Sequence, residues 1–290
     1  MQFLIFLFFY PLLWLISILP FRLLYLFSDF VCFICYYIIG YRKKIVRENI
    51  AMALPYLSEK ERLLVEKKFY HHMCDMFLEM IKTMTIPQKE MEKRYVFTNL
   101  DLYLDLEKKG KSIALLCGHY ASYEWTVSMN YHITFEGYGI YKKLSNKYFD
   151  KLVKDIRSKF KATLITTRET IPSIKKNAEI GHLGVYGFAS DQSPQLSATF
   201  HWKKFMGIEV PVHTGAEMLA KRFDMNVIFL RTKKIKRGYY EATFELMADN
   251  PKEVPNYEIT DDFLNRIEKQ IYEAPEFYLW THKRWKHRKK

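Results

Sequence analysis

The first 21 residues constrain the fold most strongly, because they form a long apolar stretch without a single charged side chain. They read MQFLIFLFFYPLLWLISILPF, and the polar side chains among them are Gln2, Tyr10 and Ser17. About 20 consecutive apolar residues are enough for a helix to cross a bilayer. No basic residue precedes the run and no small-residue cleavage site follows it, as a cleaved signal peptide would require. We therefore predict a transmembrane anchor over residues 1–21.

A second apolar segment follows at residues 22–40, RLLYLFSDFVCFICYYIIG, and it carries Arg22 and Asp29. One topology has both segments spanning the membrane as a hairpin. A carboxylate in the hydrocarbon region is costly, so Asp29 favours the other topology. In that topology residues 22–57 form an interfacial, amphipathic helical region. A pair of buried core helices is the remaining alternative.

Basic residues cluster directly after these segments, in YRKKIVREN at residues 41–49. Positive charge near a membrane segment marks the cytoplasmic side. We therefore expect a single-pass protein whose residues 58–290 form one large cytoplasmic domain.

The rest of the chain alternates between short apolar runs and amphipathic stretches. The pattern begins with a helix at 58–84, where Ser58 and Glu61 form a capping box. Alternation of this kind is typical of α/β folds with a partly parallel sheet. The sequence predicts further helices at 41–54, 100–109, 124–131, 146–160, 170–180, 215–223 and 261–274, strands at 95–98, 111–117, 137–143, 162–166 and 184–190, and a closing antiparallel hairpin formed by 226–235 and 239–246.

Charge and cysteine content narrow the class of partner. Lys and Arg exceed Asp and Glu by 13, which favours anionic partners. Cys32 and Cys35 form a C-x-x-C motif, but there is no second such pair to complete a zinc site. Small buried thiols in a reducing compartment are the simpler interpretation. No nucleic-acid-binding module is recognisable.

One histidine and one carboxylate stand out in LCGHYASYEW, residues 116–125, directly after an apolar strand. On one continuous helix His119 and Glu124 would point about 140° apart. They can meet if His119 lies in the turn after the strand and Glu124 lies in the first turns of the next helix. Gly118 suits such a turn, and α/β folds place their sites at the carboxyl ends of strands.

A carboxylate bonded to one imidazole nitrogen makes the other nitrogen a stronger base, so His119 could take a proton from a hydroxyl. The alternative is a core histidine beside an unrelated surface glutamate. Cys117 and Ser122 are the nearby nucleophilic side chains, and neither lies in a G-x-S-x-G motif.

The block GHYASYEW resembles the H-x4-D/E block of membrane-bound glycerolipid acyltransferases. It is most similar to the Glu-containing form of the lipid A late acyltransferases, the lauroyl and myristoyl acyltransferases of Gram-negative bacteria. Further blocks follow in the order of that family and cover essentially the whole chain. They are YRKKIVRENI (41–50), the helix carrying Arg157, the strand ending in Asp191 and Gln192, KKFMGIEVPVHTGAEMLA (203–220) and APEFYLWTHKRWKHR (274–288).

The chain departs from the family within the dyad block. Ala121, Ser122 and Tyr123 stand where the family often has Gly, Asn and Trp, and Trp125 follows the glutamate instead. The F-P-E-G-T-R type block of the glycerol-phosphate acyltransferases is absent. These departures affect details of the acceptor site rather than the dyad.

The resemblance implies a mixed sheet flanked by helices, of the glycerolipid acyltransferase type, at the bacterial inner membrane. It implies transfer of a fatty acyl chain from acyl carrier protein, or alternatively from acyl-CoA, to a hydroxyl of an anionic lipid A precursor. His119 would be the general base, oriented by Glu124. Arg157, Asp191 and Gln192 would bind substrate or stabilise the oxyanion, without a metal or cofactor. The alternatives are the same chemistry on a lyso-lipid or aminolipid, and a non-enzymatic membrane scaffold.

The basic segment from His282 to Lys290 has three interpretations. It could lie on the anionic membrane face, dock the carrier, or be a solvated tail. Trp280 and Trp285 suit an interfacial position and equally suit a protein core.

Overall fold

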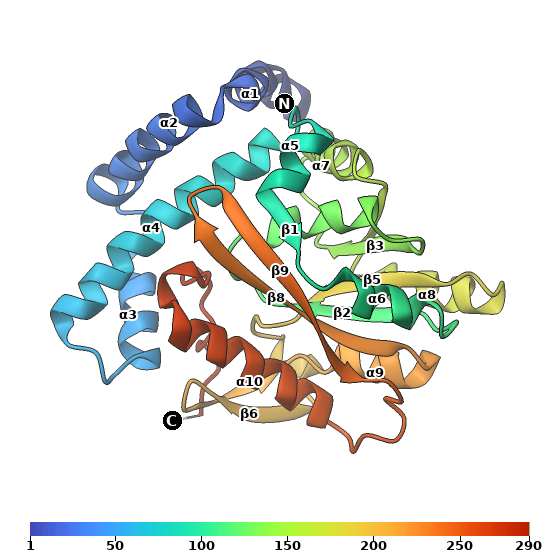
Figure 1. Cartoon of the computed structure of the whole chain (residues 1–290). Helices are drawn as coiled ribbons and strands as arrows, with labels where there is room; N and C mark the ends of the chain where they lie inside the picture. Colours follow the sequence, from blue (N-terminus) through green and yellow to red (C-terminus); the bar gives the residue numbers. More distant parts are fainter. Residues whose placement is uncertain (290) are drawn as a thin grey trace.

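A seven-stranded sheet forms the centre of the computed structural model, which describes residues 1–289 (Figure 1). The strand order is β1-β9-β8-β2-β5-β3-β4. All neighbours are parallel except β8 and β9, which form an antiparallel hairpin. The predicted α/β class and its closing hairpin are therefore confirmed. The strands are β1 Tyr95–Phe97, β2 Ile113–Cys117, β3 Glu136–Tyr141, β4 Ala162–Thr166, β5 Gly184–Ala189, β8 Asn226–Lys236 and β9 Tyr239–Ala248.

Strand β2 is apolar throughout because it lies in the middle of this sheet. It pairs in parallel with β5 on one side and with β8 on the other. Ile113 to Leu116 are all buried, as expected for a parallel strand that is covered on both faces. The register places Cys117 opposite Ala189 of β5. The residues that follow β2 and β5 therefore emerge side by side at one edge of the sheet.

Helices surround the sheet, and most of them match the predicted segments. The predicted capping box of α4 is present, since Ser58 accepts from the backbone of Glu61 and the Glu61 carboxylate accepts from the backbone of Ser58. The predicted helix at 124–131 is a 3-10 helix, η2, at Tyr123–Tyr131. The other helices are α3 Lys43–Ala53, α4 Glu59–Lys82, α5 Gln88–Arg94, α6 Leu100–Glu107, α7 Lys147–Ser158, α8 Thr170–Glu179, α9 Gly215–Phe223 and α10 Glu258–Glu273, with short 3-10 turns η3 Leu196–Ala198 and η4 Pro275–Phe277.

A second, two-stranded sheet was not predicted. It consists of β6 His201–Phe205 and β7 Ile208–Val212, which pair antiparallel across a tight turn. Both turn residues, Met206 and Gly207, have positive φ. Charged residues on β6 and a proline in β7 hide the apolar alternation that normally marks a strand.

The N-terminal apolar region is divided into two helices at Leu19 and Pro20. The first, α1, runs Gln2–Ile18, and the second, α2, runs Phe21–Phe33 and continues as the π-helical turn η1 Ile34–Ile39. Within residues 1–289, the helix that is long and apolar enough to cross a membrane is Phe21–Ile39, with a mean hydropathy of 1.7. Gln2–Ile18 is shorter. By length and composition, the candidate span is thus the second segment rather than residues 1–21.

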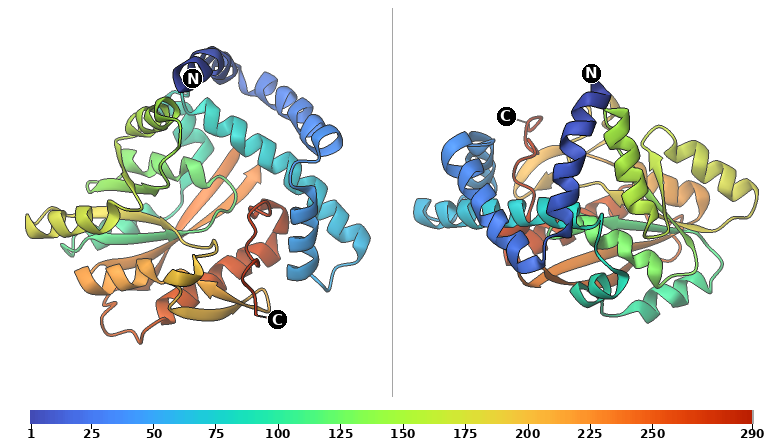
Figure 2. Two further views of the ribbon diagram at one scale, coloured as in Figure 1. Left: turned by 180° about the vertical axis from the view of Figure 1, so that it is seen from behind. Right: turned by 90° about the horizontal axis from the view of Figure 1, so that it is seen from above.

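Polar contacts tie these two helices to α4, and α2 runs beside α4 (Figure 1). Lys82 of α4 donates to the carbonyls of Ser17 and Leu19, both at 2.7 Å. Ser28 of α2 donates to Asp75 of α4 at 2.7 Å. Figure 2 shows α1 also running beside α7, where the Phe6 ring lies 5.3 Å from that of Phe149. The helices are therefore part of the folded domain on one face.

The Asp29 carboxylate, which argued against a second span, has a partner in the domain. Arg237, in the turn between β8 and β9, lies 2.6 Å from Asp29 and 2.7 Å from Asp75. The turn reaches this position because Gly238 has a φ of +73° and no side chain, and a Cβ there would collide with the Tyr25 hydroxyl. The charge of Asp29 is therefore compensated by protein.

The C-terminal segment is partly buried and partly exposed, since Lys283, Lys286, Arg288 and Lys289 are exposed whereas three large side chains are buried. Trp280, Arg284 and Trp285 are at most 1% exposed. The Trp280 indole donates to the carbonyl of Pro275 at 2.7 Å. The interfacial interpretation of the two tryptophans was therefore wrong, and they belong to the core.

Candidate active site

His119 and Asp191 come together at the carboxyl edge of the sheet. Each lies two residues beyond a strand end, His119 after β2 and Asp191 after β5, and those ends are register partners. Asp191 is fully buried, and the side chain of His119 is 19% exposed. One oxygen of Asp191, Oδ1, lies 2.7 Å from His119 Nδ1 and accepts the backbone N–H of His119 at 3.2 Å.

This pairing sets the charge of both groups. Burial alone would lower the pKa of His119, but the charge of Asp191, its hydrogen bond and the charge of Glu124 raise the pKa above its ordinary value. Burial alone would raise the pKa of Asp191, yet His119 holds it below its ordinary range. Asp191 is therefore ionised, and Nε2 of His119, which has no hydrogen-bond partner in residues 1–289, is the nitrogen that can receive a proton.

Glu124 does not occupy the position that the sequence suggested. Its carboxylate Oε2 lies 2.5 Å from Nη2 of Arg157, a residue of α7. In the described part of the chain, the carboxylate bonded to the His119 ring is that of Asp191. The prediction that Glu124 orients the ring through a direct bond was therefore wrong. Glu124 lies in η2 rather than in a regular α-helix, it is paired with Arg157, and its charge helps raise the pKa of His119.

The C-terminal segment holds the backbone of the His119 loop. The N–H of Ala121 donates to the carbonyl of Phe277 at 2.9 Å, and the N–H of Leu279 donates to the carbonyl of His119 at 3.1 Å. Between these bonds Tyr120 and Tyr278 form an isolated antiparallel bridge. Residues 277–279 thus extend the loop like a short strand, so the C-terminal segment and the middle of the sheet build the site together.

The strained residue of the loop is Ala121, not Gly118. Ala121 has a φ of +50°, in the left-handed region that favours glycine. Gly118 is required for a different reason, since a Cβ there would collide with Ile267 of α10. The position at which the family often has glycine is therefore the one at which the backbone needs it.

Neither nearby nucleophile is activated. Burial, followed by the charges of Asp191 and Glu124, raises the pKa of the Cys117 thiol to about 12. The Ser122 hydroxyl is buried and has no hydrogen-bond partner among residues 1–289. Gln192, the other predicted binding residue, is half-buried beside Asp191. The described residues contain no group of three or more His, Cys, Asp or Glu side chains that could hold a metal.

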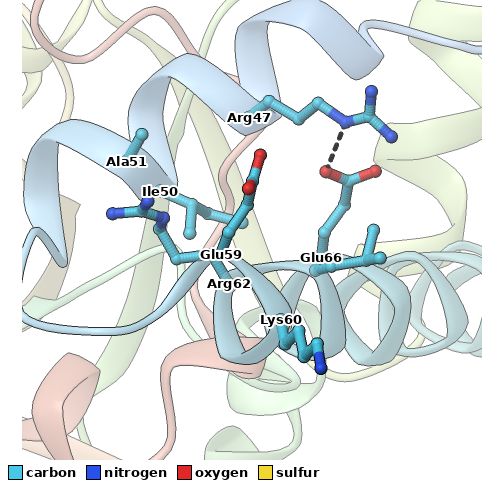
Figure 3. A pocket seen from close by; sticks show the side chains of 8 residues that line it. Arg47, Ile50, Ala51, Glu59, Lys60, Arg62 and Glu66 are labelled. Atoms are coloured by element: carbon cyan, nitrogen blue, oxygen red, sulfur yellow. Dashed lines mark hydrogen bonds and ion pairs between the residues drawn. The ribbon is translucent and has the colours of Figure 1, made fainter.

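A hollow lies elsewhere, between α3 and the start of α4 (Figure 3). Its volume is about 490 Å³. Arg47 crosses it to reach Glu66 at 2.8 Å, and Glu66 is also bonded by the Tyr36 hydroxyl at 2.8 Å. Two of its charged lining residues, Arg47 and Glu66, are therefore already paired with each other across the α3–α4 contact. Its lining residues are Arg47, Ile50, Ala51, Glu59, Lys60, Arg62, Leu63 and Glu66.

A buried carboxylate–imidazole pair with one free ring nitrogen, at the carboxyl edge of an α/β sheet, defines a site for acid–base chemistry. The family model "Bacterial lipid A biosynthesis acyltransferase" matches residues 2–287, and the chain belongs to that family. The chain is therefore an acyltransferase of lipid A biosynthesis. It is similar to the protein named "Lipid A biosynthesis lauroyltransferase" of Escherichia coli strain K12, at 23% identity over 279 residues, which cover 95% of this chain and 89% of that protein.

Proposed function

We propose that this enzyme transfers a fatty acyl chain from the thioester of acyl carrier protein to a hydroxyl of a lipid A precursor, with His119 as the general base. The observation that carries the proposal is the His119–Asp191 pair, in which Nδ1 is bonded to a buried carboxylate and Nε2 is free. A hydroxyl is a poor nucleophile at neutral pH, and a positioned base is the group it needs.

The proposed step is balanced by one proton. The acceptor oxygen attacks the thioester carbonyl carbon while His119 Nε2 takes the hydroxyl proton. The tetrahedral oxyanion then collapses, the carbon–sulfur bond breaks, and His119 returns the proton to the departing thiolate. Asp191 stabilises the imidazolium between these two events, because it is buried, ionised and bonded to the ring.

Arg157 and Glu124 are assigned electrostatic roles. Their side chains are 22% and 16% exposed, so their pairing operates in a partly water-excluded site. We assign Arg157 to stabilisation of the oxyanion. Glu124, its ion-pair partner, would orient that guanidinium and adds negative charge near His119. Gln192 offers an amide next to Asp191 for the same substrate.

Residues 1–57 are proposed as the membrane-binding part and residues 58–290 as the catalytic part on the cytoplasmic face. Support comes from the outer faces of α1, α2 and η1, which are apolar and exposed. Because both helices are bonded to α4 through their inner faces, we infer that they bind the bilayer together, instead of residues 1–21 acting as an isolated span.

The decisive experiment uses the full chain in detergent, acyl carrier protein loaded with chains of several lengths, and a tetra-acylated lipid A precursor beside a panel of lyso-lipids and aminolipids. Products are read by mass spectrometry for the wild type, His119→Ala, Glu124→Ala and Asp191→Asn. One acyl chain added to the lipid A precursor, and lost with His119→Ala, supports the proposal. Acylation of another lipid instead would show that the proposed acceptor is wrong. Turnover by His119→Ala would show that His119 is not the general base.

A further inference from the structure

Arg284 is a buried cation whose nitrogens are only partly bonded. It is 1% exposed, and Nη1 donates to the carbonyl of Pro211 at 3.2 Å. The guanidinium carbon lies 5.0 Å from the centre of the Phe205 ring. Nε and Nη2 have no hydrogen-bond partner in residues 1–289. A buried charge costs several kcal/mol unless other groups compensate it. This arginine therefore needs a nearby negative charge or hydrogen-bond acceptors.

Asp191 has one carboxylate oxygen without a hydrogen bond in residues 1–289. Its Oδ1 serves His119 twice, whereas Oδ2 is buried and accepts no hydrogen bond from the described residues. Tyr278, also buried, packs on the same Phe205 ring as Arg284, with ring centres 6.3 Å apart, and its backbone bridges to Tyr120 beside His119. Burial and then the charge of Asp191 raise the pKa of the Tyr278 hydroxyl, and Arg284 lowers it. Burial lowers the pKa of Arg284, and Tyr278 and Asp191 oppose that effect.

We propose that Arg284 and Tyr278 are positioning residues for His119. Nε and Nη2 of Arg284 and Oδ2 of Asp191 are not bonded to any described residue in this structure. A hydroxyl can both donate and accept a hydrogen bond. A rotation of the Arg284 and Tyr278 side chains would therefore let the Tyr278 hydroxyl donate to Oδ2 of Asp191 and accept from Nε or Nη2 of Arg284. Asp191 is then held through both oxygens, and it cannot rotate away from the imidazole.

The same chain of contacts tunes the charge on His119. If the Tyr278 hydroxyl or the Arg284 charge is removed, the negative charge of Asp191 is less compensated and stabilises the imidazolium more. The pKa of His119 should therefore rise in such variants. The other titratable groups around the His119–Asp191 pair are unchanged by these substitutions, and they are Cys117 at the end of β2, Tyr123 and Glu124 in η2, His213 before α9, and His282 in the C-terminal segment.

The test is an NMR titration of the His119 imidazole in the full chain in detergent, with the signal assigned by His119→Gln. Tyr278→Phe and Arg284→Met should each raise the titration midpoint by about half a unit. The double variant should add little to either, and Arg284→Lys should move the midpoint back. Arg94→Met is the matched control, since Arg94 is another buried arginine, bonded to Glu90 and to the carbonyl of Gly238.

A midpoint that stays at the wild-type value in both Tyr278→Phe and Arg284→Met overturns the proposal. If Arg284→Met does not fold, Tyr278→Phe decides alone, because it removes one oxygen and no packing volume. The catalytic meaning rests on the proposed function, but the titration needs no turnover. A shifted midpoint in a protein that acylates no lipid would keep the positioning role and discard the function.

Discussion

At the scale of single residues, Asp191 acts on His119 through both orientation and charge, and Asp191→Asn separates the two. Asparagine keeps the shape and an acceptor oxygen but loses the charge that raises the pKa of His119. We expect kcat to fall by roughly 10²–10⁴-fold, because the imidazolium formed in the reaction loses its counter-ion. The acid limb of kcat/KM should move to lower pH, since the His119 pKa falls. A pH–rate profile checks both, and an unmoved acid limb would contradict the assignment.

Ala121 gives a residue-scale prediction about stability. Its φ of +50° costs an alanine more than a glycine. Glycine also loses more freedom on folding, so the net gain from Ala121→Gly should be about 0.5–1 kcal/mol. Denaturant unfolding in detergent measures this gain. Ala114→Gly, in buried strand β2 where φ is not positive, is the matched control and should destabilise.

The sequence located His119 but not its partner, and the reason is physical. His119 follows an apolar strand and a glycine, which is a local signal. The partner depends on β5 lying next to β2, although some 70 residues separate the two bonded side chains. Spacing arguments favour local partners and therefore selected Glu124. The Asp191 position was flagged by resemblance alone, and its contact required the sheet order.

At the scale of elements, the buried carboxylate of Glu79 joins α2, α4 and β9. It accepts from the hydroxyls of Tyr25 and Tyr240, both at 2.8 Å. Burial first, with Asp75 adding, raises its pKa from 4.5 to about 7, while Lys234 and the two hydroxyls act against this. A carboxyl with a raised folded pKa stays protonated when the unfolded chain has released its proton. The free energy of unfolding therefore falls between about pH 4.5 and pH 7, by about 3 kcal/mol.

Glu79→Gln should remove this pH dependence. The variant and the wild type should have similar free energies of unfolding at pH 4.5. At pH 8 the variant should be more stable than the wild type by about 3 kcal/mol. Glu66→Gln on the same helix is the control of opposite sign, because it breaks the Arg47 ion pair and should destabilise at pH 8. Equal pH slopes for Glu79→Gln and the wild type would show that Glu79 ionises normally.

Elements were predictable where one signal dominated. The central strands are continuous apolar runs, and α4 carries both an apolar periodicity and a capping box. The pair β6 and β7 was missed because Lys203, Lys204 and Pro211 interrupt the alternation. The N-terminal division at Pro20 was visible as a proline, but hydropathy alone does not distinguish one long helix from two shorter ones.

At the scale of the whole molecule, apolar exposure and positive charge are unevenly distributed. Exposed large apolar side chains recur along α1, α2 and η1, such as Phe8 at 74% and Ile38 at 68%. Arg42, Lys43 and Lys44 follow directly after η1, within a chain of net charge +13. An apolar face bordered by cations is the arrangement that binds an anionic bilayer surface. Under the proposed function, we expect the lipid acceptor to reach the His119 site from that surface.

This arrangement predicts that membrane affinity depends on the N-terminal face and not on apolar exposure in general. Phe8→Glu combined with Ile38→Glu should lower binding to phosphatidylglycerol–phosphatidylethanolamine vesicles by at least about tenfold, because each buried apolar side chain contributes about 1.5–3 kcal/mol. Phe200 and Ile180 have the same exposures, 74% and 68%, but lie outside this face. Their glutamate variants should bind like the wild type in vesicle flotation. Equal losses in both pairs would show that apolar exposure anywhere drives binding. Unchanged binding in the N-terminal pair would place the membrane contact on another face, and the path of the acceptor to His119 would have to be drawn from there.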